Sequence, residues 1–171
     1  MTKQVVIITG PCSSGKLTIA KELANEVKNS AYVEADEIRH MIKNGYALPH
    51  IYKGESKKQV DLGTKNVIDI TNNFLKSGFN VFIEDILERK QQLDSFKKYI
   101  KGKLKIILLM PNKNTLKKRA KERRGNDKMG KRALELYDIF SKKVDKTEWH
   151  IIDTSNHSIN QTKREIIKII K

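Results

Sequence analysis

Cysteine, long apolar runs and recognisable targeting signals are nearly or wholly missing from this sequence. Cys12 is the only cysteine among 171 residues, which excludes a disulfide framework and a cysteine-rich zinc site. No apolar run approaches the roughly 20 residues that span a bilayer, and the first residues do not form a signal-peptide pattern. We therefore expect no membrane association and a reducing, cytoplasmic location.

Histidine is also sparse, and its positions exclude further classes of site. His40, His50, His150 and His157 are scattered without the spacing of metal ligands. They predict no zinc centre, and no Ser-His-Asp triad can be built from their order.

What the sequence has is a regular alternation of short apolar runs and longer helical patterns. The length suits one domain over residues 1–171. The alternation is typical of a parallel sheet with helices on both faces, so we predict an α/β fold of three layers with five parallel strands. Irregular segments at 45–55 and 124–130 are expected to be hinged loops over the site. Strands are expected at 5–9, 32–35, 81–83, 105–110 and 149–152, and helices at 15–28, 36–44, 56–77, 88–100, 113–124, 129–143 and 159–171.

The first apolar run leads directly into the pattern G-x-x-x-x-G-K, followed by a helix-forming stretch. Gly10 and Gly15 permit close backbone approaches that let successive N–H groups surround a polyphosphate. Lys16 adds a point charge, and the helix adds its positive N-terminal end. The pattern predicts a phosphate-binding loop for ATP. Its expected nucleotide contacts are Gly10, Pro11, Cys12, Ser13, Ser14, Gly15, Lys16, Leu17 and Thr18.

One position departs from this pattern. The residue after the lysine is normally Ser or Thr, whose hydroxyl ligates Mg²⁺, but here it is Leu17. We still expect Mg²⁺ with the ATP, held by the nucleotide, by waters and by carboxylates. Thr18 and Asp85 are the candidate metal ligands.

Two predicted strands end in acidic residues, where ligands of open parallel sheets bind. Asp36 follows the second strand, and Arg39 lies one helical turn later on the same face. Asp36 is the candidate general base and Arg39 a candidate acceptor-binding residue; a role as helix cap alone is the alternative for Asp36. Glu84 and Asp85 follow the third strand. Asp85 is a second candidate for binding the acceptor, and a purely structural role for this pair stays open.

Basic residues concentrate in the segment 113–132, which holds ten Lys and Arg against Glu122 and Asp127, a net charge of +8. Arg119 and Arg123 lie four residues apart on one expected helix face. This spacing favours Arg119 as a contact to the base and Arg123 as a catalytic charge on the transferred phosphoryl group. A solvated basic surface helix is the alternative.

These motifs together resemble those of P-loop kinases of the nucleoside-monophosphate-kinase-like group. The chain is most similar to AAA proteins near chloramphenicol phosphotransferase and to the kinase domain of polynucleotide 5′-hydroxyl kinases. Gly10–Lys16, Asp36-x-x-Arg39, Asp85 and the Arg119/Arg123 segment carry the resemblance. It implies a helical lid near 113–132, Asp36 as base, Arg39 as an acceptor contact and a lid arginine that stabilises the transferred group.

The sequence predicts phosphoryl transfer from ATP but leaves more than one class of acceptor open. A hydroxyl of a small molecule such as an antibiotic, nucleoside or sugar fits a chain of this size with a short covering loop. The alternatives are a nucleic-acid 5′ end, favoured by the basic segment, and a non-catalytic nucleotide-binding module. Aromatic residues make up only 6% of the chain, which argues against a groove that stacks single strands.

Overall fold

The computed structural model describes residues 3–122, 127–144 and 147–171. Five strands form a single sheet in the order β2-β3-β1-β4-β5, and every pairing is parallel. This confirms the α/β fold expected from the alternation of strands and helices. The strands are β1 (Gln4–Thr9), β2 (Ser30–Glu34), β3 (Asn80–Glu84), β4 (Lys103–Leu109) and β5 (Trp149–Ile152).

The central strand β1 explains why helices cover both faces of the sheet. Its side chains alternate, so Val5 and Ile7 pack into one apolar cluster while Val6 and Ile8 pack into the other. All four are at most 2% exposed. A strand without a polar face needs cover on both sides, which is typical of parallel sheets.

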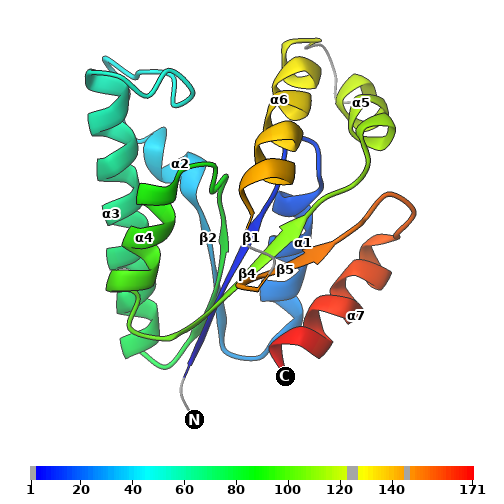
Figure 1. Cartoon of the computed structure of the whole chain (residues 1–171). Coiled ribbons are helices and arrows are strands. Elements are labelled where there is room, and N and C mark those ends of the chain that lie inside the picture. Colours follow the sequence, from blue (N-terminus) through cyan, green and yellow to red (C-terminus); the bar gives the residue numbers. More distant parts are fainter. Residues whose placement is uncertain (1–2, 123–126, 145–146) are drawn as a thin grey trace.

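The helices divide into two layers, as Figure 1 shows. Helices α1 (Lys16–Glu26) and α7 (Ile159–Ile170) pack on one face through residues such as Leu23 and Ile166. Helices α3 (Glu55–Lys76), α4 (Lys90–Tyr99) and α6 (Asp127–Lys143) cover the other face. Within the described ranges, no helix has the length and apolar character to cross a membrane.

Helix α5 (Lys113–Glu122) packs against α6, and Figure 1 shows this pair rising beyond the carboxyl end of the sheet. The expected loop at 124–130 is corrected in part, because α6 already begins at Asp127. Residues 123–126 lie outside the described residues. The irregular segment expected at 45–55 is confirmed up to Gly54, where α3 follows.

Helix α2 (Ala35–Arg39) is shorter than the expected helix at 36–44. The N–H of His40 still donates to the carbonyl of Asp36, but the next turns are tight i to i+3 turns, in which the N–H groups of Met41 and Ile42 donate to the carbonyls of Ile38 and Arg39. Ile38 and Arg39 are buried, whereas Met41 is 68% exposed. Because Met41 buries little apolar surface, packing supports no further turn of helix.

Candidate active site

The loop between β1 and α1 is held close to the sheet. A Cβ atom on Gly10 would lie 2.4 Å from the carbonyl oxygen of Leu109, so only glycine fits there. Ser13 adopts a left-handed φ of 64°, and the N–H of Ser14 donates to the carbonyl of Pro11. The Ser13 hydroxyl is buried and has no hydrogen-bond partner among the described residues. A phosphate oxygen in the loop would supply that partner.

A cavity of about 380 Å³ lies over this loop, where the carboxyl ends of β2 and β3 meet α5. Lys16 Nζ lies 3.2 Å from Glu84 Oε1, and both side chains are largely buried. Burial raises the pKa of Glu84, and the charge of Lys16 opposes part of that rise. The cavity is lined by Cys12, Ser13, Gly15, Lys16, Leu17, Thr18, Glu34, Asp36, Glu84, Ile86, Arg119 and Glu122.

The predicted pair of Asp36 and Arg39 is part of a longer chain of contacts. Arg39 Nη2 donates to Asp36 Oδ1 at 2.7 Å and to Asp85 Oδ1 at 2.9 Å. Gln92 Nε2 donates to Asp85 Oδ2 at 2.6 Å, and the N–H of Ile86 donates to Asp85 Oδ1. The Asp85 side chain is fully buried. Asp85 and Gln92 therefore fix the guanidinium that in turn orients Asp36.

Charge and packing both keep this arrangement in place. Burial acts to raise the pKa of Asp36, but the guanidinium of Arg39 and the charge of Lys16 outweigh it, so the pKa lies below its ordinary value. Asp36 is thus ionised at neutral pH. Helix α3 makes room for Arg39 at Gly63, where a Cβ atom would lie 2.7 Å from Arg39 Cγ.

A second cavity, of about 190 Å³, adjoins the first, because Asp36 and Ile86 line both. Arg39 and Gln92 form part of its wall. Asp36 therefore stands between a cavity built on the phosphate loop and a smaller one beyond it. This position between two cavities has no signal in the sequence.

Arg119 links the phosphate loop to the loop after β5. It donates to the carbonyl of Thr154 at 2.8 Å and to that of Ser14 at 3.3 Å. It lines both the large cavity and a third one of about 210 Å³, which Thr18 and Thr154 also line. Thr154 lies in the polar loop after β5. The other arginine of the predicted pair, Arg123, lies outside the described residues.

The donors around the large cavity suit a nucleotide that carries Mg²⁺. Magnesium keeps most of its waters and takes one or two carboxylates together with phosphate oxygens, and Asp36 and Glu84 face the cavity. Leu17 lines the cavity without offering an oxygen, and Thr18 lies between this cavity and the third one. Both oxygens of Asp85 are engaged by protein donors. Across the described ranges, no group of three His, Cys, Asp or Glu side chains is preformed for a metal.

Comparisons with protein families and with known proteins show which family the chain belongs to. The sequence model of the AAA domain family matches residues 6–163. The chain belongs to that family. It is also 25% identical to a guanylate kinase of Prochlorococcus marinus subsp. pastoris, over 99% of this chain and 97% of that protein.

Solved structures of kinases share the fold of this AAA-family chain. A sugar kinase of Janibacter sp. superimposes with a TM-score of 0.72 at 16% identity, covering 99% of this chain and 95% of that one. A shikimate kinase of Acinetobacter baumannii gives 0.67 at 16% identity, covering 99% and 93%. The chain therefore has the fold of these kinases.

Proposed function

We propose that this AAA-family protein is a P-loop kinase that transfers the γ-phosphoryl group of ATP to a hydroxyl of a small molecule. The observation that carries the proposal is the place of Asp36, on the shared wall of the phosphate-loop cavity and the second cavity. An acceptor hydroxyl in the second cavity would meet the nucleotide beside this carboxylate. The relatives named as kinases of small molecules support the same reaction class.

Each residue of the site has a separate role in phosphoryl transfer, which depends mainly on positioning the reactants and stabilising charge. The loop from Gly10 to Lys16 receives the phosphates, and Lys16 neutralises charge on the transferred group. Asp36 accepts the proton of the attacking hydroxyl while Arg39 holds its carboxylate in place. Bound Mg²⁺ would neutralise phosphate charge, with Asp36 and Glu84 as its carboxylate neighbours. Arg119 would contact the base, and Arg123 stays a predicted contact to the transferred group.

The test is Asp36→Asn, with Glu37→Gln as the matched control. Glu37 is the next residue of α2, but its side chain is exposed. Asp36→Asn should lower phosphoryl transfer by roughly 10²–10⁴-fold while ATP affinity stays nearly unchanged, and the control should keep full activity. A protein that only senses nucleotide would show the same slow ATP hydrolysis in both variants, and that result would contradict the proposal.

A nucleic-acid 5′ end is the second candidate acceptor. The exposed lysines of α5, namely Lys113, Lys117, Lys118 and Lys121, favour it. The small volume of the second cavity favours a small molecule instead. Oligonucleotide binding that falls by roughly 10³-fold or more between 50 mM and 200 mM salt, together with 5′-phosphorylation, would reverse this ranking.

A further inference from the structure

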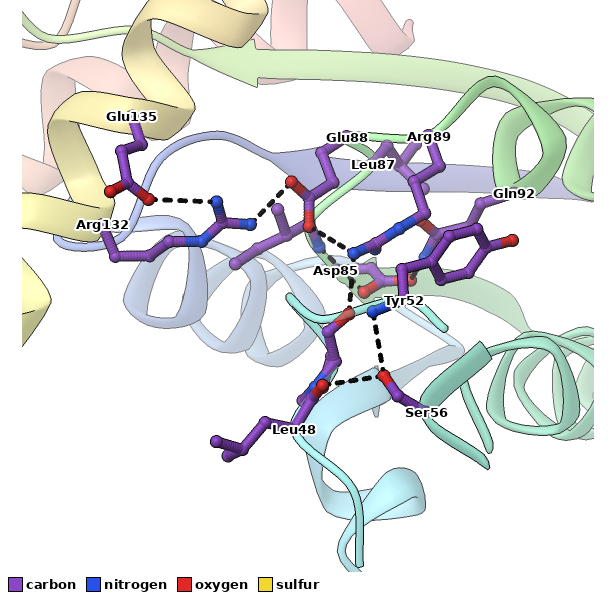
Figure 2. A network of polar contacts seen from close by, with 12 residues as sticks. Leu48, Tyr52, Ser56, Asp85, Leu87, Glu88, Arg89, Gln92, Arg132 and Glu135 are labelled. Atoms are coloured by element: carbon purple, nitrogen blue, oxygen red, sulfur yellow. Dashed lines mark hydrogen bonds and ion pairs between the residues drawn. The ribbon is translucent and has the colours of Figure 1, made fainter. Parts of the chain in front are cut away.

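Three segments that lie far apart in the sequence build the outer wall of the second cavity. They are the irregular segment before α3, the connector between β3 and α4, and the start of α6. Figure 2 shows their polar contacts, which centre on Glu88. One Glu88 oxygen lies 2.9 Å from Arg89 Nη2 and the other accepts from Arg132 Nη2 at 2.6 Å. A single carboxylate therefore bridges two guanidinium groups, and its own side chain is only 11% exposed.

The guanidinium groups of Arg89 and Arg132 also make contacts with protein groups other than Glu88. Arg89 Nη2 donates to the carbonyl of Pro49 at 2.8 Å, and its guanidinium lies 4.3 Å from the centre of the Tyr52 ring. Arg132 has a second carboxylate neighbour, Glu135, at 3.4 Å. Figure 2 shows Arg89 beside Tyr52 and Arg132 reaching from α6 toward Glu88. Neither guanidinium is left facing the cavity without an anionic partner.

Arg39 completes the set of arginines that line this cavity in the described part of the chain. It is shared between Asp36 and Asp85. The formal charges of the three arginines are thus matched by three carboxylates, those of Asp36, Asp85 and Glu88. The wall is rich in charge but offers no net attraction for an anion.

Three backbone N–H groups of the connector are also engaged within the protein. The N–H of Ile86 donates to Asp85 Oδ1, that of Leu87 to Thr9 Oγ1, and that of Glu88 to the carbonyl of Ile86. The nucleotide cavity differs in this respect. Lys16 is also paired there, but the glycine-rich loop and the N-terminal end of α1 supply N–H groups and a positive dipole to receive phosphate.

Two residues in the wall of the second cavity carry buried polar atoms with unused hydrogen-bonding capacity. Gln92 Oε1 lacks a donor and Arg39 Nε lacks an acceptor among the described residues, and both residues line the cavity. A hydroxyl group can donate and accept at once, whereas a phosphate dianion or a carboxylate can only accept. The volume of about 190 Å³ is also below the roughly 300–1,000 Å³ of sites for drug-sized ligands.

We infer that the acceptor is a compact, uncharged polyhydroxyl compound, and that Glu88 excludes phosphorylated and carboxylated analogues by occupying the guanidinium groups of Arg89 and Arg132. This inference rests on the proposed function, because it assigns the acceptor to the second cavity. An anionic acceptor would have to displace Glu88 from two guanidinium groups, or lie beside a carboxylate of like charge.

The first test measures anion binding without any acceptor. The nucleotide cavity is filled with the non-hydrolysable analogue AMP-PNP and Mg²⁺, and the unfolding temperature is followed with sodium sulfate against sodium chloride of equal ionic strength. Glu88→Gln should bind sulfate about tenfold or more tightly than the wild type, because it frees two guanidinium groups. Glu135→Gln, which touches only Arg132, should stay within about twofold of the wild type. Equal sulfate binding by wild type and Glu88→Gln would overturn the inference.

The second test uses the wild-type protein alone, so it does not depend on the folding of a variant. ATP turnover is compared between matched acceptors: ribose and ribose 5-phosphate, glucose and gluconate, guanosine and GMP. Wherever a pair supports turnover, the uncharged member should have the higher kcat/KM by about tenfold or more. A charged member that is the better acceptor would refute the inference. Turnover with none of the six would count against the proposed function, while the sulfate comparison would still decide the role of Glu88.

Discussion

Asp85 is the residue whose replacement should destabilise the site most. Its carboxylate is fully buried, and it accepts hydrogen bonds from Arg39, Gln92 and the N–H of Ile86. In Asp85→Ala these three donors lose their acceptor, and the guanidinium of Arg39 keeps only Asp36. Breaking a buried ion pair by removing one partner costs about 3–5 kcal/mol.

That free energy converts into a large change in melting temperature. A domain of this length loses about 2–4 °C per kcal/mol, so Asp85→Ala should melt about 6–20 °C below the wild type. Asp138→Ala is the matched control, because Asp138 pairs with Lys113 at the surface with both side chains about half exposed. Such exposed pairs contribute about 0.2–1 kcal/mol.

Thermal unfolding followed by circular dichroism, together with urea titration, measures both variants. The melting temperature of Asp85→Asn should lie between those of Asp85→Ala and Asp138→Ala, since an amide oxygen can still accept one of the hydrogen bonds. If Asp85→Ala melted no lower than Asp138→Ala, the buried chain of contacts from Gln92 to Asp36 would not contribute to stability. Asp85 would then not be the residue that fixes the guanidinium of Arg39.

Two further predictions concern Asp36 and Leu17. The pKa of Asp36 in the folded protein lies below its ordinary value of 3.8. The ionised carboxylate therefore stabilises the fold at pH values above 3.8, and this stabilisation is lost as the pH falls through the folded pKa. The stability difference between wild type and Asp36→Asn, measured by urea unfolding, should therefore be constant near neutral pH and shrink below about pH 4; a difference independent of pH would contradict the assignment. Leu17→Ser should lower the Mg²⁺ concentration for half-maximal turnover relative to Leu17→Ala, which also removes the isobutyl group but adds no hydroxyl; identical Mg²⁺ curves would show that the metal depends on other groups.

The sheet and the phosphate loop were predictable because their signals are local. Buried parallel strands appear as continuous apolar runs, and a loop of fixed spacing connects the first of them to its helix. The convergence of Asp36, Glu84 and Asp85 also followed from the rule that parallel strands end at one edge. Their separate roles did not follow, because successive residues at a strand end point in different directions. Glu84 pairs with Lys16, whereas Asp85 is buried behind Arg39.

The second cavity was not predictable because long-range contacts build it. Arg132 meets Glu88 across 44 positions, and Arg89 meets Pro49 across 40. Nothing in the local sequence distinguishes these arginines from the many solvated ones of a basic chain. The end of α2 was misjudged for a similar reason, because helical propensity continues past Arg39 while the burial that stabilises a helix does not.

Calorimetric titration with ATP and Mg²⁺ measures whether this protein binds ATP through its phosphate loop for phosphoryl transfer. The wild type should bind one ATP, and Lys16→Ala should lose ATP-dependent turnover while remaining folded, as its circular dichroism spectrum would show. No detectable binding to the wild type at millimolar ATP and Mg²⁺ would mean that the protein is not an ATP-dependent kinase.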